Sequence, residues 1–438
     1  MRRALALAIV ALSACSTTHQ DLGRDLTSTG TLVATRIAAG HQHTCAIDTA
    51  GRLYCWGLGH DGRLGIDPRD ALDDCGGLEC DGSPRPSPTL TGVMDVAVGE
   101  THTCALLTDG RVRCFGADVL GQLARGSADG EPHPTPVTVE LDQVHDLAAG
   151  EFHTCITRWD GSVWCWGLGQ RGQLGVDPST LERCIADGSV FYQLEVADGD
   201  PVPCATRPVQ VPGITDAEEI AAGAFHTCVT RSGGGVACWG AGSEGQLGHG
   251  DTPMAQITPV DVMGVSDISD IASGLWHTCA KDSMGGVACW GAHYWGQLGI
   301  GTEGWTLCGV DMRPCSPVAV DVDMPEVHAL ALGRVHTCGV THSGDMYCFG
   351  DATGGRLGLG AIDESCDGPW GGPHACRTLP TLVTGGIAEL ASGGAHTCVI
   401  RTGGVVACTG SNDVGQSGAP PGGMLLELTD IADPIEYR

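Results

Sequence analysis

Residues 43–57 read HTCAIDTAGRLYCWG, and six further copies of this pattern follow along the chain. Each copy opens with His-Thr-Cys and places a second Cys ten residues after the first. On both sides of a short break the side chains alternate with period two, which predicts a β-hairpin. The copies begin at His43, His102, His153, His226, His277, His336 and His396.

The two Cys define the register of this hairpin. Centring it midway between Cys45 and Cys55 leaves residues 49–51 as a three-residue loop, whose last position favours glycine because it requires positive φ. All seven copies have Gly at that position. The same register places the two Cys opposite each other, with Cβ atoms about 4.5 to 5.5 Å apart, close to disulfide geometry. We therefore predict one disulfide in each hairpin.

The 23 Cys of the chain divide into Cys15, fourteen in the hairpins, and eight in the four longer connectors between hairpins. Locally paired Cys in an exported chain are expected to form disulfides. The predicted hairpin pairs are Cys45–Cys55, Cys104–Cys114, Cys155–Cys165, Cys228–Cys238, Cys279–Cys289, Cys338–Cys348 and Cys398–Cys408. The predicted connector pairs are Cys75–Cys80, Cys184–Cys204, Cys308–Cys315 and Cys366–Cys376. Zinc bound by the His and two Cys of each hairpin is the alternative, but seven metal sites are a less simple arrangement in an oxidising compartment.

The beginning of the chain has the features of an export signal. Arg2 and Arg3 form a positive head, and residues 4–12 are apolar but too few to span a bilayer. The sequence LSAC at residues 12–15 resembles the lipobox of bacterial lipoproteins, which implies cleavage before Cys15 and acylation of that residue. We predict a signal peptide at residues 1–14, a lipidated Cys15 with a flexible tether at residues 15–30, and attachment to the cell envelope. Ser16 after the Cys favours the outer membrane.

The net charge and the amino-acid composition indicate which partners and which fold class to expect. The formal net charge is −29, which argues against nucleic acid as a partner and leaves the lipid anchor as the only expected membrane contact. With 68 Gly and 5% aromatic residues, the composition is that of a turn-rich, all-β protein.

The connectors complete the predicted fold. The short connector after Gly248 contains two further β-like runs, at residues 257–262 and 267–272, so each repeat has four strands. Seven such repeats at residues 31–438 predict an all-β, seven-bladed β-propeller, whose closure into a ring removes exposed ends. Residues 31–39 supply one connector strand and residues 424–428 another. We therefore expect strands from both termini to close the ring in a joint blade.

Three repeated motifs support this prediction, and they are AAGEFHTC at residues 148–155, DGSVWCWG at residues 160–167 and GQLG at residues 172–175. They resemble the repeats of the regulator of chromosome condensation family over residues 31–430. The resemblance implies a seven-bladed propeller closed by both termini. The family includes a nuclear exchange factor, chromatin and ubiquitin-system proteins and a secreted β-lactamase inhibitor, so it implies no single function.

The repeated His and Trp are expected to be structural. Chemistry rarely needs seven equivalents of one residue, so we expect each His to bond to backbone near the start of a strand. Trp56, Trp166, Trp239 and Trp290 are expected to pack between blades rather than to form a ligand cage.

The four Cys-containing connectors are insertions that leave the repeat at the same point, so they should emerge from one face of the disk. Loops on a rigid scaffold commonly carry binding residues, although these insertions also fit a merely decorative role. The candidate binding face comprises Tyr192, Trp305, Trp370, Asp73 and Asp74. Calcium binding at residues 70–81 is disfavoured because no Asp-x-Asp-x-Asp-Gly loop is present.

No hydrolase, nucleotide or metalloprotease motif is present, and no carboxylate pair stands out by spacing. We therefore predict a monomeric, non-enzymatic envelope lipoprotein, without metal or cofactor, that binds a protein or a glycan through the insertions. One alternative is a hydrolase-like envelope enzyme with its site in the central opening or under the insertions. Another is a structural role in the envelope without a ligand.

Overall fold

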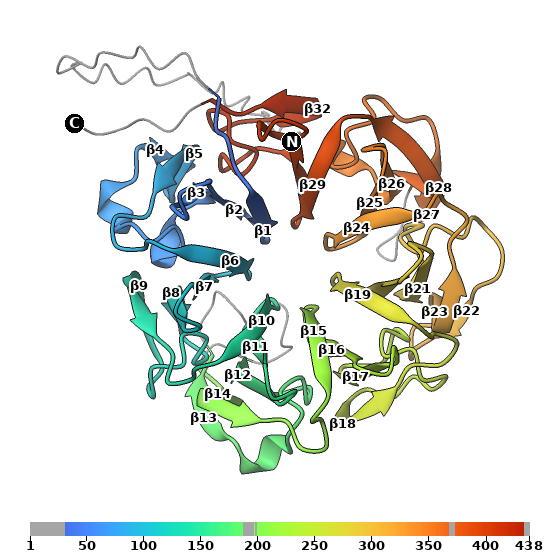
Figure 1. Ribbon diagram of the computed structural model, residues 1–438, viewed down its shortest axis with the longest axis horizontal. Helices are drawn as coiled ribbons and strands as arrows, with labels where there is room; N and C mark the ends of the chain where they lie inside the picture. The colour runs from blue at the N-terminus through green and yellow to red at the C-terminus, as the bar shows by residue number, and fades with distance from the viewer. Residues whose placement is uncertain (1–30, 187–196, 198, 368–372, 433–438) are drawn as a thin grey trace, which may run out of the picture.

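The computed structural model describes residues 31–432, except 187–196, 198 and 368–372. Seven antiparallel sheets surround a central axis, so the predicted seven-bladed propeller is confirmed (Figure 1). The predicted signal peptide, Cys15 and the tether lie outside the described residues. No helix in the described part of the chain is long and apolar enough to cross a membrane. The loops of the described segments contain four 3-10 turns: η1 (His60–Gly62), η2 (Pro68–Asp70), η3 (Pro178–Thr180) and η4 (Thr353–Gly355).

The four main strands of each blade run in chain order from the axis to the rim. In blades 1 to 7, the innermost strands are β1 (Arg36–Ala39), β6 (Val93–Val98), β10 (Val144–Ala149), β15 (Ala217–Ala222), β19 (Ile268–Ser273), β24 (Val327–Leu332) and β29 (Ile387–Ser392). The second strands are β2 (His43–Ile47), β7 (His102–Leu107), β11 (His153–Arg158), β16 (His226–Arg231), β20 (His277–Asp282), β25 (His336–Thr341) and β30 (His396–Arg401). The third strands are β3 (Leu53–Leu58), β8 (Val112–Asp118), β12 (Val163–Leu168), β17 (Val236–Gly240), β21 (Val287–Ala292), β26 (Met346–Asp351) and β31 (Val406–Ser411).

The fourth strands lie at the rim and are β5 (Glu79–Pro86), β9 (Asp129–Thr138), β14 (Pro201–Gln210), β18 (Gln256–Asp261), β23 (Arg313–Asp321), β28 (Pro373–Thr384) and β32 (Met424–Asp430). The insertions of blades 1, 3, 5 and 6 each add a short fifth strand outside the fourth. These are β4 (Asp73–Asp74), β13 (Glu182–Ile185), β22 (Thr306–Cys308) and β27 (Ser365–Asp367).

The hairpin register is the one expected from the sequence. Cys45 pairs directly with Cys55, and Gly51 in the loop has a φ of 73°. The seven hairpin disulfides join Cα atoms 4.0 to 4.2 Å apart, and the four insertion disulfides join Cα atoms 5.8 to 6.1 Å apart. All eleven predicted pairs are therefore bonded, and the Cys of each hairpin cannot serve as zinc ligands.

The core lies between the blades. Trp56, Trp166, Trp239 and Trp290 are fully buried. Each indole N–H donates to a carbonyl of the preceding blade, as Trp166 does to Gln122 at 2.8 Å. The indoles thus join neighbouring blades as expected, by a hydrogen bond as well as by packing.

The repeated His are structural, but the expectation that they bond to backbone was wrong. Each Nε2 lies 2.7 to 3.0 Å from the Thr hydroxyl in the His-Thr-Cys motif of the next blade. The contact from His396 to Thr44 completes this circle of hydrogen bonds. The neighbouring blade comes close enough for its hydroxyl to take the place of a local carbonyl, which a linear sequence does not reveal.

Both termini close the ring, but the joint blade was a wrong expectation. Blade 1 consists of β1 to β5 and blade 7 of β29 to β32, so the strands of each come from one continuous stretch of the chain. Closure instead depends on residues 31–34, which bridge to the last blade through Thr31–Ala432 and Val33–Val405. The Leu32 N–H donates to the Ile431 carbonyl at 3.1 Å.

The insertions share one face of the disk but not one place on it. The turn from the first strand to the second and the connection from the third to the fourth lie at the same end of each antiparallel blade, and we call that end the insertion face. The opposite end, with the hairpin loops, is the turn face. Blades 1, 3, 5 and 6 spread their fifth strands around the circumference (Figure 1).

Candidate functional site

Seven equivalent loops meet at the axis on the insertion face. Each follows an innermost strand and carries one residue after the Gly of the Ala-Ala-Gly-type motif. In blades 1 to 7 these residues are His41, Glu100, Glu151, Ala224, Leu275, Arg334 and Gly394. Together with the ends of the innermost strands, they line a cavity of about 80 Å³, which we call the axial pocket. Polar side chains from blades 1, 2, 3 and 6 occupy one part of it, and blades 4, 5 and 7 contribute uncharged residues.

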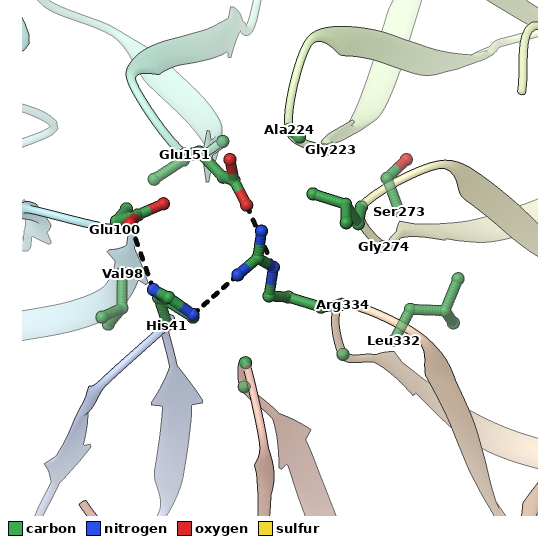
Figure 2. Close-up of a pocket in the computed structure, with 18 of the residues that line it drawn as sticks. His41, Val98, Glu100, Glu151, Gly223, Ala224, Ser273, Gly274, Leu332 and Arg334 are labelled. Carbon is green, nitrogen blue, oxygen red and sulfur yellow. Dashed lines mark hydrogen bonds and ion pairs between the residues drawn. The ribbon is translucent and has the colours of Figure 1, made fainter. Parts of the chain in front are cut away.

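The polar side chains form a chain across the axis (Figure 2). Arg334 forms an ion pair with Glu151, with Nε and Oε1 3.3 Å apart. Its Nη1 lies 2.8 Å from Nε2 of His41, whose Nδ1 lies 3.1 Å from Oε1 of Glu100. Because a guanidinium only donates, Nε2 of His41 is the acceptor and Nδ1–H donates to Glu100. His41 is therefore neutral in this arrangement.

Glu151 stands out in this group. Both of its carboxylate oxygens are buried, and neither accepts a hydrogen bond from the described residues. Burial raises the pKa of Glu151 to about 8, the nearby Glu100 adds to that rise, and Arg334 opposes it. A buried, ionised carboxylate without hydrogen bonds is unfavourable. A hydrogen-bond donor beside Glu151 would therefore stabilise its ionised form.

Two further arginines support the axial loops from behind. Arg63 donates to the carbonyl of Glu100 at 2.8 Å, and Arg356 donates to the carbonyl of Gly394 at 3.5 Å. Each also pairs with its own carboxylate, Asp61 for Arg63 and Asp351 for Arg356. The backbone of the pocket is therefore fixed by ion pairs outside it.

The insertion of blade 5 presents apolar side chains to solvent. Trp305 is 40% exposed, Met312 61% and Val310 90%. The disulfide Cys308–Cys315 closes the hairpin formed by β22 and β23, and Trp305 is also held by its N–H donating to the Thr302 carbonyl at 3.0 Å. These side chains are thus exposed on a constrained loop, where ordering for binding costs little.

The predicted candidate face is not brought together in the described structure. Asp73 and Asp74 form β4 in blade 1, whereas Trp305 lies in blade 5, at another part of the circumference (Figure 1). Both carboxylates are used locally, since Asp73 accepts from the Gly82 N–H in β5 and Asp74 accepts from the Gly77 N–H in the turn between β4 and β5. Tyr192 and Trp370 lie outside the described residues. Among the described residues no three potential ligands form a metal site.

The sequence reasoning missed the axial residues. Their signal was the variable position directly after the repeated Gly, where His, Glu, Glu, Ala, Leu, Arg and Gly alternate within an otherwise regular motif. A position that varies while its neighbours repeat is not needed to maintain the structure of the repeat. The seven residues at this position come together at the axis only because the ring is closed.

The fold and the repeated hairpin define a seven-bladed propeller built from a single type of repeat. The chain belongs to the regulator of chromosome condensation family, since the RCC1-like domain matches residues 15–370 and the RCC1 repeat matches residues 387–416.

Relatives with several kinds of name share this repeat. The ultraviolet-B receptor UVR8 of Arabidopsis thaliana is 29% identical over 363 residues, which are 82% of this chain and 71% of the receptor. The regulator of chromosome condensation of Xenopus laevis is 26% identical over 378 residues, 83% of this chain and 80% of the relative. The human E3 ubiquitin-protein ligase HERC2 is 30% identical over 310 residues, 69% of this chain but 6% of the ligase. These names share no single activity.

The solved structure of Prp20p from Saccharomyces cerevisiae has the same fold. Its TM-score is 0.70 with 20% sequence identity, and the match covers 92% of this chain and 88% of that protein.

Proposed function

We propose that this protein is an exported lipoprotein whose propeller binds a partner protein on its insertion face, without catalysis. The observation that carries the proposal is the exposed apolar group of the blade 5 insertion, Trp305, Val310 and Met312, on a hairpin clasped by a disulfide. Exposed aromatic and apolar side chains on a rigid support are typical of binding hot spots. Protein binding is also described for a relative of the same fold, since the Prp20p structure is reported with its binding to Gsp1p and histones.

The cavities on this face favour binding over catalysis. Small-molecule sites usually have volumes of about 300 to 1,000 Å³. The axial pocket has about 80 Å³. A larger hollow under the blade 3 insertion has about 420 Å³, but the only carboxylate that lines it in the described structure is Asp129, which pairs with Arg125 and His133. A pair of free carboxylates for hydrolysis is therefore not placed there by the described residues.

The binding proposal predicts that truncating the blade 5 group weakens capture of the partner. Replacing Trp305, Val310 and Met312 together by Ser should lower affinity by at least about 30-fold, because loss of a hot-spot Trp alone commonly costs about 2 kcal/mol or more. The measurement is affinity capture from envelope extracts, followed by titration of the captured protein.

A matched control is available on the turn face, where Trp159 is 72% exposed and Met284 and Met94 are also exposed. Replacing these three by Ser removes similar apolar surface and should leave capture unchanged. Equal losses from both triple variants would contradict the proposal, and recovery of a glycan instead of a protein would change the class of partner.

The anchor is proposed from the LSAC sequence at residues 12–15. Cys15→Ala should release the protein from membranes into the soluble fraction, because several acyl chains contribute about 0.8 kcal/mol per buried methylene. Fractionation with and without detergent measures the change. Continued dependence of the Cys15→Ala variant on detergent would count against lipid anchoring.

A further inference from the structure

The axial pocket contains two carboxyl groups and one guanidinium. The carboxylates of Glu100 and Glu151 face one guanidinium, that of Arg334, and His41 is neutral. No other titratable side chain lines the pocket in the described structure. Arg63 and Arg356, behind the loops, are each neutralised by their own Asp partners. If Glu151 were ionised, one negative charge in the pocket would be uncompensated. Because burial raises the pKa of Glu151 to about 8, its carboxyl group holds a proton at pH 7 until a cation enters.

Glu151 has an unused capacity for donors. The only polar contact of its side chain in the described structure is the 3.3 Å ion pair with Nε of Arg334, and both carboxylate oxygens lack a hydrogen bond. A carboxylate can accept several hydrogen bonds, and those from a charged donor are the strongest. A cation with free N–H groups that enters the pocket would donate hydrogen bonds to the carboxylate oxygens of Glu151.

The size and lining of the pocket select the form of that cation. A cavity of about 80 Å³ accommodates an ammonium with its adjoining methylenes more readily than a second planar guanidinium beside Arg334. Ala224 and Ser273 lie on the side opposite the charged group (Figure 2), and Leu275 also lines the pocket. This wall is mainly apolar and is suited to the methylene stem of a lysine, whose ammonium carries three donors.

We infer that the axial pocket binds one alkylammonium group, a lysine side chain of the partner protein, against Glu151. This inference rests on the proposed protein-binding function and specifies its chemistry at the axis, whereas the blade 5 group supplies apolar contact at the rim. In the bound state the ammonium donates to Glu151 and its methylenes lie against Leu275.

The test uses n-butylammonium as a probe for the lysine side chain and n-butanol as its uncharged counterpart, each titrated into the full chain at pH 7. We expect saturable one-to-one binding of butylammonium in the millimolar range and no saturable binding of butanol. Binding should also release close to one proton, because the ammonium lowers the pKa of Glu151 from about 8. Calorimetry in buffers of different ionisation enthalpy measures both quantities.

Two variants locate the site, and a third, Asp363→Asn, is the control. Glu151→Gln keeps the shape of the side chain and should weaken butylammonium binding at least tenfold and abolish proton release. Ser273→Leu should block the pocket from its uncharged side without touching the ion pairs. Asp363→Asn removes a carboxylate that is almost fully exposed and should change neither quantity. Thermal melting confirms that each variant is folded.

Three results would overturn the inference that the axial pocket binds an ammonium group. Binding that persists in folded Glu151→Gln, or equal binding of butanol, would overturn the inference. Absence of saturable butylammonium binding to the unmodified protein would also overturn it. None of these results bears on the proposed function, which is tested separately by partner capture with the two triple variants.

Discussion

Reduction of the disulfides should unfold the propeller at neutral pH. Each hairpin disulfide closes a loop with a sequence separation of 10 residues, and in the chain-entropy model such a loop contributes about 2 to 3 kcal/mol. Seven of them contribute about 14 to 21 kcal/mol, which matches or exceeds the upper end of the roughly 5 to 15 kcal/mol by which proteins are usually stable. The chain has only 5% aromatic residues with which to form a compensating core. We therefore expect the reduced and alkylated chain to show neither native circular dichroism nor a cooperative melting transition.

Single pairs should separate the two kinds of disulfide. Replacing Cys228 and Cys238 by Ala should lower the free energy of unfolding by about 2 to 3 kcal/mol, because the disulfide no longer restricts the unfolded chain. The loss should affect the whole ring, because the hairpin of blade 4 also contacts the next blade through His226. Replacing Cys366 and Cys376 by Ala is the matched control, since both disulfides span a sequence separation of 10. That pair clasps an insertion at the rim, so its loss should alter the insertion more than the melting of the ring. A reduced chain that melts like the oxidised one would contradict this account.

Acid should destabilise the folded protein strongly through the circle of seven His. Each His is hydrogen-bonded to a Thr hydroxyl of the following blade, and in six of the seven cases that hydroxyl donates its own proton to a backbone carbonyl. The hydroxyl must therefore accept from Nε2–H of the imidazole. Nδ1 of all seven His is buried and has no hydrogen-bond partner among the residues that the structure describes. Burial lowers the pKa of His102, His153, His226, His277 and His396 to about 3, and lowers the pKa of His43 and His336 well below 6.5.

The sign follows from proton binding. Between pH 6.5 and about 3 the unfolded chain holds a proton on each of these His and the folded chain does not, so the free energy of unfolding falls as the pH falls. Each His contributes up to about 1.4 kcal/mol per pH unit. Burial raises the pKa of carboxylates such as Asp270, to about 6, which opposes the loss until both states are protonated near pH 4. The steepest loss is therefore expected below about pH 4.5.

Urea unfolding of the oxidised protein from pH 7.5 to 3 measures this dependence. His226→Gln is the informative variant because burial alone lowers the pKa of His226. It should lower stability at pH 7, through loss of packing, and should take up one proton fewer on unfolding at pH 5. An unchanged proton uptake in His226→Gln would show that the neutral imidazole is not the source of the acid sensitivity.

The accuracy of the sequence predictions follows the range of the contacts involved. Opposition of Cys45 and Cys55 depends on a single hairpin, where a ten-residue spacing and a Gly at positive φ leave one register. The blade count followed from counting the same unit along the chain. The prediction of a joint blade was wrong. One connector strand at each end of the sequence fits both a blade shared by the two termini and two separate terminal blades, and only the bridges from Thr31 and Val33 to the last blade distinguish these arrangements.

The candidate site was harder to predict for the same reason. Arg334 and His41 are 293 positions apart in sequence, and Thr44 and His396 are 352 apart. No periodicity relates such residues, because their separation depends on how many blades close the ring and at what angle. The insertions were correctly assigned to one face by their shared exit point, but their spread around the circumference is a property of the closed disk.

The amino-acid sequence alone determined the hairpin, its disulfide and the seven-fold repetition, because each depends on residues within one repeat and on backbone sterics. The tertiary structure decided which side chains meet at the axis, where the His donate and how the termini close the ring. These contacts join different blades, and a side chain finds its partner there only when all seven blades are in place.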